Sequence, residues 1–203
     1  MQVPAFSAAA DRNKQPILEA LQTVLPATGS ALEIASGTGQ HITWFAQHLP
    51  DWQWQPTDTF DDALQSIAAH TAQAGLSNVQ SPLKLNVLQR PWLPESALFD
   101  LVYCANMIHI APWSTCAALI RLSAQHLAPG GILITYGPYF EDELDTATGN
   151  LNFDQSLRAE NPDWGIRRRE DVEAEALAAG LRLARRVQMP ANNLLLIWQR
   201  AAA

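Results

Sequence analysis

The chain has little cysteine, no surplus of positive charge and no long apolar run, and each shortage excludes a class of protein. Two cysteines, Cys104 and Cys116, are too few for a disulfide framework or a zinc cage, and neither belongs to a Cys-x-x-Cys pair. The 13 basic residues are outnumbered by 20 acidic ones, giving a net charge of −7, so no global positive field favours nucleic acid or an anionic membrane. No apolar run of about 18 residues exists, which excludes a membrane span.

The first residues and the composition narrow the class further. The N-terminal stretch has no basic segment followed by an apolar one, so no signal peptide is predicted. With 203 residues, 48% of them hydrophobic, one large domain can bury a full core without disulfides or metals. These observations predict a soluble, acidic, cytoplasmic protein that forms a single domain over residues 1–203. No long apolar seam indicates a dimer, so a monomer is the default expectation.

Helical and strand patterns alternate along most of the chain. Amphipathic spacing predicts helices over 11–25, 39–49, 61–74, 112–127 and 169–180. Short apolar runs predict strands over 31–35, 52–56, 81–87, 98–105 and 131–137. Two further strands, 181–189 and 193–200, are joined by turn residues and predict an antiparallel hairpin. Residues 138–165 are polar, acidic and weakly periodic, which predicts a loop or lid.

This alternation predicts a three-layer α/β fold whose seven-stranded sheet is mostly parallel and ends in the antiparallel hairpin. Such sheets bind ligands outside the carboxyl ends of their strands. The residues at those ends are small, polar or aromatic, as expected for a small-molecule site. They are Ala35–Gly39, Asp58, Asn86–Val87, Asn106–His109 and Tyr136–Tyr139.

The most informative stretch is Glu33–Gly39. Gly37 and Gly39 allow a tight turn from strand to helix and a close approach to a ligand. Asp58 ends the second predicted strand, where a carboxylate can accept both hydroxyls of a ribose. We therefore favour a cofactor loop over a merely tight connection. A dinucleotide fingerprint would have a third glycine at position 42, which is Ile42 here, and this weakens an NAD interpretation.

The pattern Glu33-x-Ala35-x-Gly37-x-Gly39 resembles motif I of the class I S-adenosylmethionine-dependent methyltransferases. More narrowly, the chain resembles the DUF938, or methyltransferase-like 26, group of uncharacterised methyltransferase-like proteins. The stretches that carry this resemblance are Arg12–Ile17, Leu32–His41, Asn161–Arg167 and Met189–Asn193, so it covers nearly the whole chain. Ala35 departs from the general motif, which often has its first glycine there. The resemblance implies a Rossmann-like methyltransferase fold, S-adenosylmethionine as cofactor and S-adenosylhomocysteine as product.

The resemblance also implies which residues hold the cofactor. Glu33 would hold the first loop and, directly or through water, the amino group, while Asp58 would take the ribose hydroxyls. Asn86 would suit the exocyclic amine of adenine. Further contacts are implied for Arg12 and Lys14 (carboxylate, or an acidic substrate), Ala35, Gly37 and His41 (methionine portion), Gly39 (loop), Thr59 (ribose), Val87 (adenine) and Asn106 (sulfonium).

Catalysis needs a general base only if the acceptor arrives protonated. His109 and Tyr139 are then the candidates, because a neutral imidazole is available near pH 7. The alternative for His109 is an ordinary polar residue of the pocket wall. The run 167–169 is followed by two acids and predicts a solvated charge cluster, with an anionic-substrate site as the alternative. No metal site is predicted, since the acidic run 141–145 has no histidine partner.

Together these inferences predict methyl transfer from S-adenosylmethionine to an unidentified small-molecule acceptor by in-line displacement. The segment 138–165 and the N-terminal segment would close over that acceptor. One alternative is a non-catalytic S-adenosylmethionine-binding or interaction protein on the same fold. The other is an NAD-dependent oxidoreductase. Neither nucleic acid nor membrane is predicted as a partner.

Overall fold

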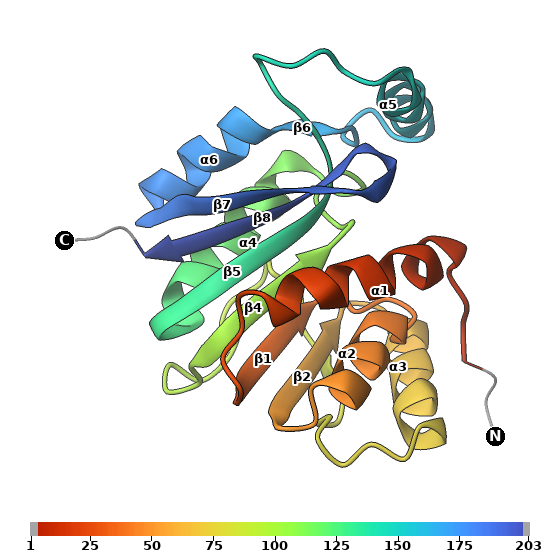
Figure 1. The fold of residues 1–203 in the computed structure, drawn as a ribbon, viewed down its shortest axis with the longest axis vertical. Helices are drawn as coiled ribbons and strands as arrows, with labels where there is room; N and C mark the ends of the chain where they lie inside the picture. Colours follow the sequence, from red (N-terminus) through yellow and green to blue (C-terminus); the bar gives the residue numbers. More distant parts are fainter. Residues whose placement is uncertain (1–3, 201–203) are drawn as a thin grey trace. The chain divides into compact units, whose positions relative to one another are not determined.

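The computed structural model describes residues 4–200 (Figure 1). The chain divides into two compact units. Unit 1 comprises Met1–Asn86 and Phe99–Cys104, and unit 2 comprises Val87–Leu98 and Ala105–Ala203. The single domain expected over residues 1–203 stays a prediction. None of the helices within residues 4–200 is both long and apolar enough to cross a membrane.

Unit 1 is built on a parallel sheet. β1 (Gly29–Ile34) pairs in parallel with β2 (Trp52–Asp58) and with β4 (Phe99–Ala105), and β2 pairs in parallel with the short β3 (Leu83–Lys84). The helices of this unit are α1 (Ala8–Gln22), α2 (Gln40–His48) and α3 (Asp61–Gln73). α1 packs on α2, while α2 and α3 both pack on β2. Because the strands are parallel, the carboxyl ends of β1 and β2 lie at one edge of this sheet.

Two tryptophans fill the interior of unit 1. Trp52 and Trp54 point to the same face of β2 and are fully buried, with their ring centroids 6.1 Å apart. The Trp52 Nε1–H donates to the carbonyl of Pro26 at 3.0 Å. Gly29 lies so close that a Cβ there would approach the Trp52 ring to 2.7 Å. Burial of each ring contributes about 3 kcal/mol, so the pair is a main source of stability for this unit.

Unit 2 contains the C-terminal strands. β8 (Asn193–Arg200) lies between β5 (Leu127–Phe140) and β7 (Leu181–Met189) and is antiparallel to both, while β6 (Arg167–Arg168) pairs in parallel with the end of β5. The helices are α4 (Trp113–His126), α5 (Thr148–Glu160), α6 (Arg169–Ala178) and the short 3-10 turn η1 (Pro190–Asn192). α4 contacts both α6 and β5. At the hairpin tip, Ala191 and Asn192 adopt φ values of 57° and 55°, as a tight hairpin turn requires.

The predicted fold class is confirmed. β1 to β4 pair in parallel, and the C-terminal hairpin is antiparallel as expected. The number of strands differs, because residues 4–200 contain eight strands rather than seven. The additional strand is β6, and a strand of two residues has no periodicity by which a sequence pattern could reveal it.

The prediction of a loop over residues 138–165 is wrong for much of this segment. β5 continues to Phe140, and α5 occupies Thr148–Glu160. The pattern failed because α5 buries only Asn150 and Leu157 and is attached largely through polar contacts. The Asn150 amide donates to the carbonyl of Asn192 at 3.1 Å, and Asp154 Oδ1 accepts from the Ile166 N–H at 2.7 Å. A lid role for this segment stays a prediction.

Candidate functional site

Asp58 holds the loop between β1 and α2 in shape. Its Oδ2 accepts from the Gly37 N–H at 2.9 Å, and its Oδ1 accepts from the N–H groups of Thr59 and Phe60 at 2.8 and 3.1 Å. Each carboxylate oxygen has about two acceptor positions, so Oδ1 is fully used and Oδ2 has one left. Asp58 is only 6% exposed. It can therefore accept one more strong hydrogen bond, such as one from a hydroxyl group.

The glycines of this loop do different things. Gly37 and Gly39 both have positive φ, 57° and 87°. A Cβ on Gly39 would lie 2.8 Å from the Cα of Ile67, so close packing against α3 requires glycine there. A Cβ on Gly37 would meet only the carbonyl oxygen of Ala35, at 4.0 Å, and Gly37 is exposed. The loop surface at Gly37 is therefore open.

Ala35, which stands where the general motif often has its first glycine, has the backbone conformation of a glycine. Its φ is 56°, in the left-handed region that favours glycine. An alanine in this region is strained by about 1–2 kcal/mol. The backbone at Ala35 thus keeps a conformation typical of glycine although the residue has changed.

Glu33 is a buried carboxyl group with an unsatisfied oxygen. The residue is 2% exposed, and its Oε2 has no hydrogen-bond partner. Burial raises the pKa of Glu33 to about 8; a hydrogen bond with Ser36 opposes this shift and the charge of Asp58 adds to it. The carboxyl is therefore mostly protonated at neutral pH. An unpartnered buried oxygen is where a bound polar group would gain a hydrogen bond.

His41 ties three elements of unit 1 together. Its Nε2 lies 2.6 Å from Asn13 Oδ1 on α1, and its Nδ1 lies 3.4 Å from the Tyr103 hydroxyl on β4. Its ring also stacks on Phe45, with centroids 5.5 Å apart. Burial lowers the pKa of His41 to about 4, so the imidazole is neutral and can donate to Asn13 while accepting from Tyr103. Both ring nitrogens are occupied by neighbours within the unit.

The remaining predicted residues of unit 1 lie on its surface or are half-buried. Arg12 is exposed on α1. Lys14 pairs with Asp11 at 2.5 Å and lies 4.8 Å from the centroid of the Trp44 ring, so its ammonium group already has partners. Thr59 and Asn86 are half-buried.

Sequence reasoning missed Phe60. Its side chain is 73% exposed, and its backbone N–H donates to Asp58 Oδ1, so an open aromatic ring follows this carboxylate by two positions. An exposed aromatic ring in such a place is a stacking surface. An aromatic residue just beyond the second predicted strand was the signal that could have found it.

In unit 2, His109 and Asn106 lie close to Gly137. A Cβ on Gly137 would approach His109 Nδ1 to 3.3 Å and Asn106 Oδ1 to 3.6 Å. His109 is 4% exposed, and its Nδ1 has no hydrogen-bond partner. Burial, assisted by the positive charge of Arg167, lowers the pKa of His109 to about 4. Phe153 of α5 contacts the imidazole edge-on, with centroids 5.6 Å apart. The result is a buried, neutral imidazole whose Nδ1 has no hydrogen-bond partner.

The other two predicted residues of unit 2 have local roles. The Tyr139 hydroxyl donates to Thr135 Oγ1 at 2.8 Å, and Tyr139 also lines a polar cavity of about 150 Å³ together with Glu141 and Arg186. Val87 is buried, and its carbonyl accepts from the Trp92 indole at 2.7 Å.

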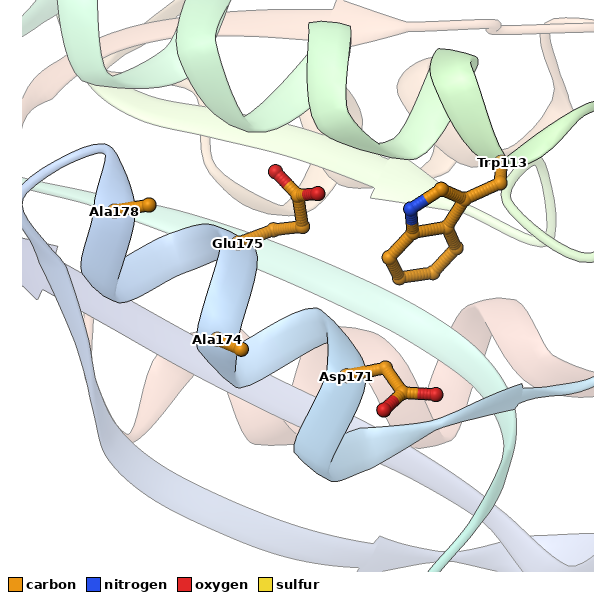
Figure 2. Close-up of a pocket in the computed structure, with 5 residues that line it drawn as sticks. All are labelled: Trp113, Asp171, Ala174, Glu175 and Ala178. Atoms are coloured by element: carbon orange, nitrogen blue, oxygen red, sulfur yellow. The ribbon is translucent and has the colours of Figure 1, made fainter.

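A larger hollow of about 440 Å³ lies between α4 and α6 (Figure 2). Figure 2 shows the Trp113 indole facing α6, which carries the carboxylates of Asp171 and Glu175 and the methyl groups of Ala174 and Ala178. None of the cofactor-binding or catalytic residues named above lines this hollow.

Residues 4–200 match the model of a family described as "Protein of unknown function (DUF938)". The chain belongs to the DUF938 family. This confirms the narrower resemblance seen in the sequence, while the methyltransferase-like 26 label stays a prediction.

The DUF938 chain is similar in fold to solved methyltransferases. The mitomycin 7-O-methyltransferase MmcR matches with a TM-score of 0.80 and 14% identity, over 96% of this chain and 56% of that one. An O-methyltransferase family 2 protein from Planctomyces limnophilus, solved with apigenin, matches at 0.76 and 17%, over 93% and 62%. Human N-acetylserotonin methyltransferase, solved with S-adenosylmethionine, matches at 0.76 and 14%, over 96% and 53%. The chain thus spans less than two thirds of these proteins. At such identities the likeness shows the fold, which is the Rossmann-like methyltransferase fold that the sequence predicts.

Proposed function

We propose that this DUF938 protein catalyses transfer of a methyl group from S-adenosylmethionine to a small-molecule acceptor by in-line displacement. The loop after β1 is the observation that carries the proposal. Three of its residues have a left-handed backbone, and its surface is open at Gly37. Asp58, which holds this loop, has one acceptor position left on Oδ2. Shared fold with methyltransferases, one of which was solved with apigenin, supports the same conclusion. The cofactor, when bound, supplies a methyl group on a sulfonium leaving group.

The residues of unit 1 fit this cofactor. The spare position on Asp58 Oδ2 suits a ribose hydroxyl, and the exposed ring of Phe60 suits the face of adenine. The open surface at Gly37 allows close approach of a ligand. Glu33 Oε2 would gain its missing partner from the amino group, and a bound ammonium would lower the pKa of Glu33 from its value of about 8.

The other cofactor contacts expected from the sequence remain part of the proposal. His41 would contribute by packing, because both of its nitrogens are already partnered. The further residues of this set are Arg12, Lys14, Ala35, Gly39, Thr59, Asn86, Val87 and Asn106.

The candidate proton acceptors, His109 and Tyr139, belong to unit 2. His109 has an unpartnered Nδ1, and its low pKa keeps the imidazole neutral throughout the neutral pH range. A weak base suffices here, since an oxygen that is gaining a methyl group becomes strongly acidic as the bond forms. Tyr139 is the less favoured base, because its hydroxyl already donates to Thr135.

Calorimetric titration with S-adenosylmethionine, S-adenosylhomocysteine and NADH tests the cofactor. The loss of a hydrogen bond to a charged group, about 1.5–3 kcal/mol, should weaken binding to Asp58→Ala and Asp58→Asn about 10- to 100-fold. The matched control is Asp51→Ala, since Asp51 is exposed at the start of β2. Failure of the folded wild-type protein to bind either sulfur compound would refute the proposal, and binding of NADH instead would favour the oxidoreductase.

A screen of hydroxylated aromatic compounds with a labelled methyl donor then tests turnover. Labelled product with at least one acceptor supports the enzyme. Tight cofactor binding without transfer to any acceptor would favour the non-catalytic alternative.

A further inference from the structure

The guanidinium group of Arg167 spans the backbone of the loop that carries His109. Its Nε donates to the carbonyl of Ile108 at 3.1 Å, and one of its terminal nitrogens donates to the carbonyl of Ala111 at 2.5 Å. The same nitrogen donates to the carbonyl of Asp163 at 2.8 Å. One side chain on β6 therefore fixes the loop on both sides of His109.

The backbone before Arg167 completes this attachment. The Gly165 N–H donates to the carbonyl of His109 itself at 2.9 Å. Gly165 has a φ of 146°, and a Cβ there would lie 2.7 Å from the guanidinium of Arg158 and 2.9 Å from Asp154 Oδ1. Residues 163–167 thus form a bracket, whose donors satisfy the carbonyls of residues 108, 109 and 111.

The bracket is in turn fastened to α5. Asp154 accepts from the Ile166 N–H through Oδ1 and from the Arg158 side chain through Oδ2, both at 2.7 Å. Phe153, the neighbour of Asp154, is the residue whose ring contacts the His109 imidazole. In Figure 1, α5 leads directly through this stretch into β6. The His109 loop is consequently held through its backbone by β6 and through its ring by α5.

We propose, building on the role proposed above for His109, that Arg167 is a positioning residue. By holding the carbonyls of Ile108 and Ala111, it fixes the His109 imidazole in the orientation needed for proton transfer. Arginine is suited to this task because its planar fork reaches two acceptors in fixed directions. A lysine at the same position would present one compact ammonium group and could not bridge both carbonyls. The titratable groups around this fork are the Cys116 thiol, Arg158, Asp154 and Asp163. The Arg167 guanidinium carbon lies 5.9 Å from the centroid of the Trp113 ring.

Three variants separate positioning from charge and from general surface effects. Arg167→Lys keeps the charge but loses the bridge, and Arg167→Gln loses both. Arg168→Gln is the matched control, because Arg168 is the exposed neighbour that pairs with Asp142 and donates to none of the carbonyls of residues 108, 109 and 111. Circular dichroism confirms folding; if Arg167→Gln does not fold, Arg167→Lys alone decides the outcome.

The decisive readout is the imidazole itself, followed by NMR and assigned by comparison with His109→Gln. In both Arg167 variants we expect a shifted His109 resonance and faster amide exchange at Gly165. In Arg167→Gln, which also removes the positive charge, the titration midpoint of His109 should rise above its wild-type value of about 4. Arg168→Gln should match the wild type. Unchanged His109 resonance and midpoint in both Arg167 variants would overturn the proposal.

Enzyme kinetics separates this proposal from the proposed function. With an acceptor in hand, the Arg167 variants should lose about 10- to 100-fold in kcat, as misplaced catalytic groups do, with unchanged affinity for S-adenosylmethionine. If the wild-type protein binds no S-adenosylmethionine, the proposed function fails, and the NMR result still decides whether Arg167 positions His109. If the His109 resonance of a variant has shifted but its kcat is unchanged, Arg167 does not position His109 for catalysis.

Discussion

Gly37 and Gly39 stand two residues apart in the loop after β1, and alanine at each position should have a different consequence. At Gly39, φ is 87° and the new methyl group would lie 2.8 Å from the backbone of Ile67. At Gly37, φ is 57° and the methyl group would meet only one atom, at 4.0 Å. Gly75, at the end of α3, has a φ of 64° with no atom within 4 Å, so it serves as a control for backbone strain alone.

The magnitudes follow from these contacts. Alanine with positive φ is strained by about 1–2 kcal/mol. Because alanine also lowers the conformational entropy of the unfolded chain relative to glycine, about 0.4–1 kcal/mol of this strain is offset. Gly37→Ala and Gly75→Ala should therefore each lower the free energy of unfolding by about 1 kcal/mol. Gly39→Ala adds overpacking against α3, worth about 1–3 kcal/mol, so its total is about 2–4 kcal/mol.

Urea unfolding followed by tryptophan fluorescence measures the difference. With a slope of about 2 kcal/mol/M, Gly39→Ala should lower the midpoint by about 1–2 M and the other two variants by about 0.5 M. Binding should show the reverse order, since only Gly37→Ala fills the open surface proposed for the cofactor. The reasoning is refuted if Gly37→Ala destabilises the protein as much as Gly39→Ala, or if Gly39→Ala resembles Gly75→Ala.

Three further predictions concern single side chains. The pKa of Glu33 is raised from 4.5 to about 8, so folding favours its protonated form and stability should fall as pH rises between these values. Glu33→Gln should remove this slope and stabilise the protein by a few kcal/mol at pH 9, as urea midpoints from pH 5 to 9 would reveal. Phe60→Ala should weaken S-adenosylmethionine binding about 10-fold with stability changed by less than about 0.5 kcal/mol, because the ring is exposed; calorimetry checks the former and thermal unfolding the latter. His109→Gln should lower kcat about 100-fold without altering cofactor affinity, and an undiminished kcat would exclude it as the base.

The strands and helices of the core could be predicted because their burial leaves a period in the sequence. Ile17, Leu18 and Leu21 lie on one face of α1 and are buried, and the mostly apolar residues 31–34 are buried in β1. α5 left no such signal, since its attachment depends on Asn150 and Asp154, polar residues whose partners lie far away in the chain. A hydrogen bond to a distant carbonyl has no period, so pattern analysis took this helix for a loop.

The residues of the loop after β1 could be named from the sequence, but their contacts could not. That Asp58 accepts from Gly37 depends on the register of β1 beside β2, which brings residues 21 positions apart into contact. The same holds for His41, whose partners on α1 and β4 lie 28 and 62 positions away. Sequence spacing identifies residues at the ends of strands, while the direction in which each side chain points is decided by tertiary packing.

The two acceptor positions of Asp58 Oδ2 have a consequence for the kinetics of binding. A hydroxyl can take the spare position while the Gly37 N–H keeps the other, so the loop after β1 need not open or refold when a ligand arrives. The entropy of ordering this loop is then lost during folding and not at association. Ligand binding to unit 1 should accordingly show a single fast phase in stopped-flow experiments. Differences in affinity among ligands should come mainly from their dissociation rates.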